Sequence, residues 1–430
     1  MAQLQGIPST DKPRVVIIGG GFGGLKLAKS LSKEEIQIVL IDKNNYHTFQ
    51  PLLYQVATSG LNGASIAYPF RKFFDNQNNF FFRLTEVLSV DTERQTLTTL
   101  IGEINYNYLI IATGAETNFF GNEQMQQHAI SLKSINDAVM LRNTILCNLE
   151  NALQARDQEQ LNMLMDFVIV GGGPTGVELA GALSELRKHV FPRDYKELNI
   201  KEMDIHLIQS GDQLLKGMSA EASEESLRLL QQYDVKVWLN SRVKSYDGKT
   251  VTLASGEELK TKTLIWTAGV IGSPIKGLKE GAIVKGNRIL VNEYNRVEGY
   301  DNIFAIGDVA CMITPEYPEG HPMVAQPAIQ QGKLLAKNLI LLNKGKPLAS
   351  FNYHDQGSMA TIGRNHAVAD LKIFKKEFKM QGFFAWLIWM FIHLISIISF
   401  KNRLIVLLNW VAGYFSYDKG IRLIMGKKKE

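Results

Sequence analysis

The first 270 residues alternate short apolar runs with glycine-rich turns and helix-forming segments, and this order occurs twice. The first copy consists of an apolar run, a glycine turn, a helix and a second apolar run, at residues 15–18, 19–24, 25–31 and 36–41. The second copy has the same parts at residues 167–170, 171–176, 177–189 and 204–208. Apolar runs separated by helices are typical of buried parallel strands. The pattern predicts an α/β fold with two Rossmann-like dinucleotide-binding domains.

Polar stretches and turn residues predict the elements around these units. A polar helix over residues 134–160 would connect the two units, and Asp247-Gly248 predicts a hairpin in the second. A third stretch, residues 292–369, contains a short strand at 303–306 and a helix at 327–342. It is too small to be another nucleotide domain, so we expect it to pack onto the first.

The longest apolar stretch lies near the C-terminus. Residues 383–400 form 18 positions without Asp, Glu, Lys or Arg, about 27 Å as a helix and just short of a bilayer core. A second apolar segment, 404–415, follows Lys401 and Arg403, and Trp and Tyr accompany both segments. This pattern favours an amphipathic helical membrane anchor that lies in the interface. A single spanning helix and a buried core or dimer interface remain as alternatives.

Length, charge and cysteine content narrow the class of protein. A chain of 430 residues exceeds the usual size of one hydrophobic core. Residues 371–430 contain eleven Lys and Arg but three acidic residues, a charge of +8 within a total of +5, so residues 1–370 carry −3. A basic, apolar tail on an acidic body favours a membrane surface and argues against nucleic acid. Two cysteines, Cys147 and Cys311, cannot form a disulfide framework, and the eight His show no metal-ligand spacing.

Both glycine turns match G-x-G-x-x-G directly after an apolar strand, at Gly19, Gly21 and Gly24 and at Gly171, Gly173 and Gly176. In this motif the first glycine permits a tight turn and the second lets a pyrophosphate approach the backbone. The third glycine lets helix and strand pack closely. One match would also fit an ordinary turn between packed elements, whereas two matches in strand and helix context favour two nucleotide sites.

The residue after each second strand refines the ligand. Asp42 follows Gly19 by 23 residues, where a carboxylate accepts hydrogen bonds from an adenosine ribose, and we assign this site to FAD. The second copy has the neutral Gln209. A carboxylate there would repel a 2′-phosphate, so Gln209 either removes the discrimination against NADPH or still binds an NADH ribose without selecting.

Two further features support the nucleotide sites. A strand that enters Ala112-Thr113-Gly114 in the first unit has its counterpart before Ala268-Gly269 in the second. Gly307-Asp308 also follows a short strand, and its carboxylate could bind a ribityl chain, although it could equally be an ordinary turn aspartate.

At this point the sequence resembles the two-dinucleotide-binding flavoprotein reductases and, within them, the type II NADH:quinone oxidoreductases. The resemblance covers most of the chain and rests on residues 16–24, 46–60, 112–114, 171–183, 307–308 and 325–330. It implies a noncovalent FAD, NADH or NADPH bound over the flavin, and a lipid quinone as acceptor. It also favours peripheral, monotopic attachment, for which we expect the cytoplasmic face of the cell inner membrane, and we expect a homodimer.

The motifs and the resemblance together predict the binding residues. For FAD these are Gly19, Gly21, Phe22, Gly23, Gly24, Asp42, Lys43, Pro51, Leu52, Val87, Ala112, Thr113, Gly114, Gly307, Asp308, Ala325 and Gln326. For NAD(P)H they are Gly171, Gly173, Pro174, Thr175, Gly176, Glu178, Gln209, Ala268 and Gly269.

Four residues are candidates for the chemistry. Gln326 and Gln330 are four apart on one helix face, where their amides could donate to a quinone or flavin oxygen; outside this motif such a pair is usually solvated. By resemblance Gln326 lies between flavin and quinone, and Gln330 along the quinone path. Glu178, in the first turn of its helix, could simply suit the helix dipole, but the resemblance places it on a proton route. Lys379 resembles a lysine near the flavin, or is solvated.

We expect an enzyme that oxidises NADH by hydride transfer to FAD and reduces a membrane quinone without proton pumping. The alternatives are a related FAD-dependent reductase with another acceptor, including one like the sulfide:quinone oxidoreductases, and a membrane-bound flavoprotein that senses nucleotides with little turnover. Residues 43–60 contain no cysteine, which argues against peroxide or disulfide reduction. The predicted segments are 1–125 and 291–370 for FAD, 126–290 for NAD(P)H and 371–430 for the membrane anchor.

Overall fold

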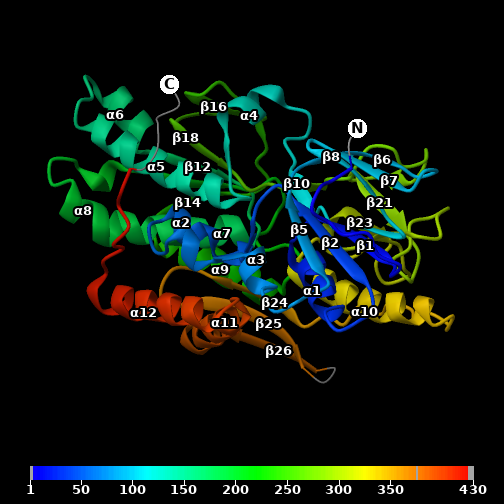
Figure 1. Ribbon diagram of the computed structural model, residues 1–430. Helices are drawn as coiled ribbons and strands as arrows, with labels where there is room; N and C mark the ends of the chain where they lie inside the picture. The colour runs from blue at the N-terminus through cyan, green and yellow to red at the C-terminus, as the bar shows by residue number, and fades with distance from the viewer. Residues whose placement is uncertain (1–2, 374–375, 425–430) are drawn as a thin grey trace. The chain divides into compact units, whose positions relative to one another are not determined.

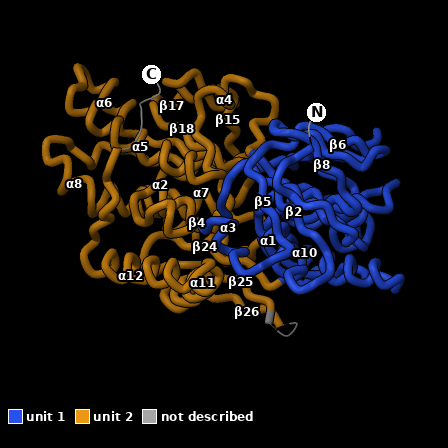
Figure 2. Tube along the Cα trace, viewed as in Figure 1, with its two compact units in different colours: residues 1–47, 68–116, 270–355 blue, residues 48–67, 117–269, 356–430 orange. Residues whose placement is uncertain are grey.

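The computed structural model describes residues 3–373 and 376–424 (Figure 1). The chain divides into two compact units (Figure 2). Unit 1 comprises residues 1–47, 68–116 and 270–355, and unit 2 comprises residues 48–67, 117–269 and 356–430. Four short strands occur where the chain passes from one unit into the other: β3 (Tyr46–Thr48), β4 (Ala67–Pro69), β10 (Ala115–Thr117) and β19 (Val270–Gly272).

A parallel five-stranded sheet forms the centre of unit 1. Its strands follow the order β22 (Ile303–Ala305), β9 (Tyr108–Ile111), β1 (Arg14–Ile18), β2 (Gln37–Asp42) and β5 (Phe80–Leu84). Val16 pairs with Val39 on one side and with Leu109 on the other, and all three are fully buried. The continuous apolar runs thus become strands that are covered on both faces, which confirms the predicted α/β fold.

Three helices and two small sheets complete unit 1. The helices are α1 (Phe22–Ser30), α3 (Phe70–Phe73) and α10 (Ala325–Asn343). One small sheet contains β6 (Val87–Asp91), β7 (Thr96–Thr99) and β8 (Gly102–Asn105), and the other β20 (Ile283–Val284), β21 (Arg288–Val291) and β23 (Ala310–Met312). Helix α10 packs against α1, as expected for the third stretch of the chain.

Unit 2 repeats the parallel architecture. Its main sheet has the order β11 (Ile130–Ser131), β18 (Thr263–Trp266), β12 (Phe167–Val170), β13 (Ile205–Ile208) and β14 (Val235–Trp238). The predicted hairpin at Asp247-Gly248 joins β15 (Val243–Tyr246) to β16 (Thr250–Leu253), which also pairs with β17 (Glu258–Lys260). The helices before the tail are α2 (Leu53–Ala57), α4 (Glu123–His128), α5 (Ile135–Ala152), α6 (Gln158–Met165), α7 (Pro174–Glu185), α8 (Phe191–Asp194) and α9 (Ala220–Gln232).

The polar stretch 134–160 forms two helices rather than the one predicted. Ser134 begins α5 with a capping box, because its hydroxyl accepts the Asp137 N–H while the Asp137 carboxylate accepts the Ser134 N–H. Asp157 caps the start of α6 in the same way, by accepting from the Gln160 N–H. A second capping residue inside the stretch starts a new helix there.

The C-terminal part of unit 2 consists of an antiparallel sheet and two helices. The sheet contains β24 (Gly357–Thr361), β25 (Ala367–Ile373) and β26 (Lys376–Gln381), and the helices are α11 (Phe383–Ser396) and α12 (Phe400–Ser416). Residues 356–370, predicted to belong with the FAD segment, are grouped with unit 2 because β24 and β25 pack against α7, α9 and α11. Within the described residues, no helix is both long enough and apolar enough to cross a bilayer.

Candidate functional site

The two glycine turns lie at the carboxyl ends of β1 and β12, where the fold leaves no room for a side chain. Gly19 has φ +100° and Gly171 has φ +113°, in the region that favours glycine. A Cβ on Gly19 would stand 2.3 Å from the Ala112 carbonyl oxygen, and one on Gly171 would stand 2.7 Å from the Ala268 Cα. Each turn therefore presses against the small residues after the neighbouring strand, as the repeated Ala-Thr-Gly and Ala-Gly segments suggested.

The helix after each turn is also held close to it. A Cβ on Gly24 would lie 2.0 Å from the Gly19 carbonyl oxygen, and one on Gly176 would lie 1.9 Å from that of Gly171. The N-cap residues of α1 and α7 are glycines, so no side chain caps the first amides. Uncapped N–H groups beside a tight turn suit a pyrophosphate.

A polar side chain from the next strand fixes each turn. The Asp42 carboxylate accepts hydrogen bonds from the Gly20 N–H at 2.6 Å and the Asn44 N–H at 2.7 Å. Burial raises the pKa of Asp42, and these hydrogen bonds oppose that rise. In unit 2 the Gln209 amide oxygen accepts from the Gly172 N–H at 3.0 Å. Gln209 thus occupies the position that Asp42 has in unit 1, but without a charge.

The remaining predicted FAD residues of unit 1 surround the first turn or lie on neighbouring elements. The Thr113 hydroxyl is buried and has no hydrogen-bond partner among the described residues. Gly307 begins a 3₁₀ turn that includes Asp308, and its N–H donates to the Gln331 side chain at 2.7 Å. Ala325 and Gln326 begin α10, Val87 begins β6, and Lys43 forms an ion pair with Glu86. Pro51 and Leu52 belong to unit 2, in the turn before α2.

Gln331 is a site residue that the sequence reasoning missed. It is 1% exposed, and its amide fixes the Gly307 turn. The signal was available, since Gln331 lies three residues after Ala328 and four before Leu335, on the buried face of α10. An amide within an apolar helix face needs a specific partner.

The two predicted quinone-site glutamines make different contacts. The Gln330 amide binds both backbone groups of His354, donating to its carbonyl at 2.8 Å and accepting from its N–H at 3.0 Å. The Tyr353 hydroxyl donates to the Gln326 amide oxygen at 3.3 Å. Both amides therefore help to hold residues 353–354 against α10.

A hollow in unit 2 contains Glu178. It encloses about 800 Å³ including its open mouth. It is lined by α2, α7, β24, both tail helices and the segment after them, through Tyr54, Gln55, Thr58, Gly60, Glu178, Ala182, Glu185, Thr361, Gly363, Arg364, Trp386, Trp389, Met390, Asn409, Trp410, Gly413, Tyr414, Asp418 and Lys419. Five of these residues are Trp or Tyr, which suits a flat, apolar ligand.

Glu178 is 7% exposed, and burial raises the pKa of its carboxyl to about 8. The Thr361 N–H donates to it over a long 3.4 Å and opposes the rise only in part. A carboxyl with this pKa is protonated at neutral pH, so it can donate a hydrogen bond or a proton. The Tyr54 hydroxyl, 3.0 Å from the Thr361 hydroxyl, lies beside it, and burial raises its pKa as well.

Lys379 does not line this hollow. Its ammonium binds both oxygens of Glu221 at 2.9 and 3.0 Å, and both side chains are about half exposed. The ion pair links β26 to the first turn of α9. The structure thus groups Glu178 with Tyr54, Thr361 and Trp389, residues that the sequence reasoning did not select because they come from distant parts of the chain.

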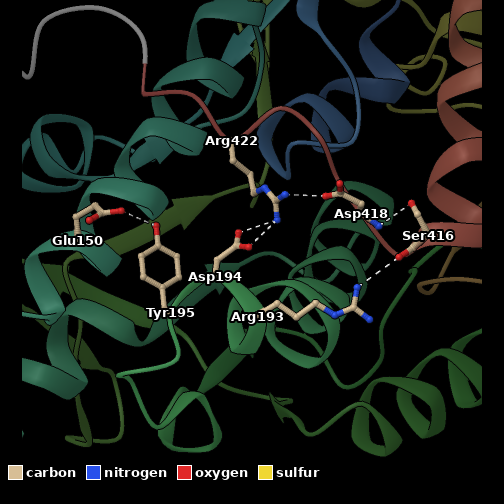
Figure 3. A network of polar contacts seen from close by, with 7 residues as sticks. All are labelled: Glu150, Arg193, Asp194, Tyr195, Ser416, Asp418 and Arg422. Atoms are coloured by element: carbon tan, nitrogen blue, oxygen red, sulfur yellow. Dashed lines mark hydrogen bonds and ion pairs between the residues drawn. The ribbon is translucent and has the colours of Figure 1, made fainter.

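Polar contacts drawn in Figure 3 hold the segment after α12 against α8, and a further ion pair holds it against α7. Arg422 binds Asp194 at 2.7 Å and Asp418 at 2.8 Å, and Arg193 donates to the Ser416 carbonyl at 3.4 Å. Lys419 binds Glu185 at 3.2 Å. These two tail cations, expected to attract lipid, are thus paired within the protein because acids of α7 and α8 lie within reach. Lys427, Lys428 and Lys429 lie outside the described residues.

Two glycine-rich turns after parallel strands, one of them followed by a helix that places a buried carboxyl in a hollow, are typical of a dinucleotide-dependent oxidoreductase. The model of the pyridine nucleotide-disulphide oxidoreductase family matches residues 13–332, and that of the NDH2 C-terminal domain matches residues 355–416. A type II NADH:quinone oxidoreductase of Mycobacterium tuberculosis is 36% identical and covers 98% of this chain and 91% of its own length. The chain belongs to the type II NADH:quinone oxidoreductases. It is a flavoprotein enzyme that oxidises NADH and reduces a quinone.

Solved structures share the fold. The structure of NDH2 from Plasmodium falciparum in complex with NADH has a TM-score of 0.87 at 22% identity, covering 96% of this chain and all of that chain. The sulfide:quinone oxidoreductase of Aquifex aeolicus has a TM-score of 0.73 at 20% identity, covering 91% of each chain. Among sequence relatives, a Staphylococcus aureus type II NADH:quinone oxidoreductase is 29% identical over 83% of this chain and 89% of its own length.

Proposed function

We propose that unit 1 binds FAD noncovalently, that unit 2 binds NADH, and that the hollow containing Glu178 receives the quinone head group. The observation that carries the proposal is the buried Glu178 carboxyl in an aromatic hollow that the tail helices help to form, where burial raises its pKa. When bound, the flavin supplies the redox chemistry by accepting hydride and returning electrons to the quinone. The chain supplies orientation, exclusion of water and a proton.

The first cradle fits a flavin dinucleotide in three respects. Its turn has no room for a side chain, so backbone amides can reach a pyrophosphate. Asp42, whose carboxylate binds the Gly20 N–H of the turn, would also accept hydrogen bonds from a ribose. The buried Thr113 hydroxyl, which has no partner among the described residues, would gain one from the dinucleotide. Asp308, Ala325 and Gln326 would complete this site.

The flavin assignment is tested by analysing the released cofactor. Heat-denatured protein should release FAD in about one equivalent, identified by chromatography and mass. Asp42→Ala should lower that content several-fold, because both the turn and the ribose lose an acceptor. Glu86→Ala, which removes only the exposed partner of Lys43, is the matched control and should retain FAD. Release of FMN, or equal FAD in Asp42→Ala, would contradict the assignment.

Glu178 is proposed to donate a proton to the quinone oxygen. At neutral pH its carboxyl is in the acid form, and the surrounding Trp and Tyr side chains exclude water. Glu178→Gln should slow quinol formation at least tenfold but leave NADH oxidation, measured anaerobically by flavin bleaching, within about twofold. Glu159→Gln, at an exposed ion pair on α6, is the control.

Binding in the hollow is tested separately with a photoreactive quinone. Mass spectrometry should find labelled residues among those that line the hollow, and a short-chain quinone should reduce the labelling. Specific labelling confined to other surfaces would contradict the proposed location.

For Gln326, Gln330 and Lys379 we propose the roles that the family resemblance implies. Gln326 would lie between flavin and quinone, Gln330 along the quinone path, and Lys379 near the flavin. Gln330→Ala should slow quinone reduction more than NADH oxidation, and equal losses would contradict its place on the quinone path.

The tail helices are proposed to attach the enzyme peripherally to the cytoplasmic face of the cell inner membrane. Large apolar side chains of α11 and α12 are exposed, including Phe384 at 70%, Phe391 at 63%, Phe400 at 78% and Phe415 at 79%. Such a surface is costly in water and suits a lipid interface.

We also propose that the enzyme is a homodimer. Light scattering in detergent should then give a protein mass of twice the 48.2 kDa chain.

A further inference from the structure

Phe120 combines two unfavourable features in unit 2. Its side chain is 68% exposed, and its backbone has φ +52°. The left-handed region is costly for a bulky residue, and an exposed phenyl ring is costly in water. Strained residues of this kind persist where the surrounding structure enforces them, and they gather at binding sites.

Hydrogen bonds on both sides of Phe120 enforce this conformation. The Asn118 N–H donates to the Gly269 carbonyl at 3.1 Å, and the Trp266 indole donates to the Asn118 carbonyl at 2.8 Å. The Asn118 side chain in turn accepts from the Phe120 N–H at 2.8 Å. After the ring, Asn122 caps α4 and donates to the Lys244 carbonyl at 3.0 Å. The backbone at Phe120 is therefore fixed on both sides.

Phe120 lies at the edge of the second glycine-rich turn, residues 171–176. The Phe120 Cζ atom lies 3.3 Å from where a Cβ on Gly269 would stand, and its ring meets the Trp266 ring edge-on at 6.3 Å. Gly269 follows Ala268, which abuts the Gly171 turn. In the sheet order, β18 and β13 lie on opposite sides of β12. Phe120 packs beside the end of β18, and Gln209 directly follows β13. The two residues therefore flank the turn on opposite sides.

We propose that Phe120 covers the nicotinamide half of the bound dinucleotide. This inference rests on the proposed placement of NADH in unit 2. The proposal places the pyrophosphate on the turn and the adenosine ribose at Gln209, on the β13 side. The nicotinamide half then extends over the opposite side, past the end of β18, where it contacts Phe120 and Gly269. The exposed face of the ring packs against the nicotinamide ribose and excludes water from it. Phe120 is thus a positioning residue for the hydride donor.

Half-nucleotide probes test this assignment on the oxidised holoenzyme. Dissociation constants are measured by calorimetry for NAD⁺, nicotinamide mononucleotide and ADP-ribose. Phe120→Ala should weaken NAD⁺ and nicotinamide mononucleotide by roughly tenfold and leave ADP-ribose within about twofold. Leu100→Ala, at a residue of unit 1 that is 65% exposed, is the control and should change none of them. Unchanged mononucleotide binding, or equal weakening of all three ligands, would overturn the proposal.

Phe120→Gly separates a binding role from a structural one. Glycine accepts φ +52° without strain, so the melting temperature should stay equal or rise while mononucleotide binding weakens. A lower melting temperature with unchanged mononucleotide binding would show that the ring only stabilises the loop. Gln209→Ala should weaken ADP-ribose instead. If wild type binds no ADP-ribose, or Gln209→Ala leaves its affinity unchanged, the placement of NADH in unit 2 fails and the inference fails with it.

Discussion

Glu178 shows how one residue couples function to stability. Its pKa of about 8 lies above the ordinary value of 4.5. Between these values the folded protein keeps a proton that the unfolded chain has lost, so the free energy of unfolding falls as pH rises through this window. The slope from this one group is on the order of 1 kcal/mol per pH unit. The buried Glu178 carboxyl therefore lowers the free energy of unfolding near neutral pH.

Glu178→Gln should therefore stabilise the enzyme increasingly with pH. Glutamine stays neutral, so the difference in melting temperature between variant and wild type should grow from pH 5 to pH 8. Asp166, whose pKa burial raises to about 7, contributes a slope of the same sign to both proteins and cancels in the comparison. Thermal scans at five pH values measure the difference, and a constant difference would show that Glu178 is charged in the folded state.

Gln209 is the residue at which coenzyme preference should change. Its amide oxygen is occupied by the Gly172 N–H, a bond that a glutamate oxygen can also make. Gln209→Glu should therefore keep the turn and add a charge that repels a 2′-phosphate. We expect kcat/KM for NADPH to fall more than tenfold relative to that for NADH. Gln231→Glu, on the exposed side of α9, controls for general charge, and an unchanged ratio in Gln209→Glu would show that selection lies elsewhere.

At the scale of elements, helices and strands followed the periodicity of the chain closely. The apolar runs became the strands of two parallel sheets, and Gly-rich turns led into α1 and α7 as predicted. The stretch 134–160 became two helices because Asp157 offers a second cap, a local signal that was present in the sequence. The grouping of β24 and β25 with α7 and α9 had no such local signal, since it depends on which surfaces pack.

The end of α12 depends on a contact that no local pattern shows. Arg364 donates to the Gly413 and Tyr414 carbonyls at 2.8 and 2.7 Å, and its guanidinium lies 3.8 Å from the centre of the Tyr417 ring. A cation at a helix C-terminus satisfies free carbonyls and the helix dipole. Arg364 and Lys419 line the hollow, and the ion pair of Arg422 holds the same segment in place.

Arg364→Ala should free the segment 413–422. The loss of two charge-assisted hydrogen bonds should cost about 2 kcal/mol locally, so hydrogen exchange at 410–422 should speed up more than tenfold. Arg228→Ala, which removes an exposed ion pair on α9, should change exchange little. Equal protection in wild type and Arg364→Ala would mean that other contacts hold the segment.

At the scale of the whole molecule, the excess positive charge and the exposed apolar side chains both belong to the C-terminal segment that we propose attaches to the membrane. The tail exposes phenylalanines on α11 and α12, yet two of its cations bind acids of α7 and α8. Membrane affinity should therefore depend more on apolar burial than on Lys419 or Arg422. Each buried phenylalanine contributes roughly 2 kcal/mol to such an interface.

Replacing both Phe384 and Phe391 with Asp should weaken binding to anionic lipid vesicles more than tenfold in flotation assays. NADH oxidation with a short-chain, water-soluble quinone should be retained, because neither residue lines the hollow. Leu84→Asp with Leu100→Asp, two exposed residues of unit 1, is the control. Unchanged flotation of the tail variant would place the membrane contact on another surface.

The order of apolar and glycine residues by itself predicted the two nucleotide-binding folds and the apolar tail. It also predicted that Asp42 and Gln209 follow the second strand of each fold. Such features are predictable because strands, turns and helix starts depend on neighbouring residues. The hollow around Glu178, the Gln331 bond to Gly307, the fastening of residues 413–422 and the place of Phe120 required the folded chain. Each joins residues far apart in sequence, and the raised pKa of Glu178 arises from burial by those distant neighbours. Desolvation is a property of three-dimensional packing, which no local pattern encodes.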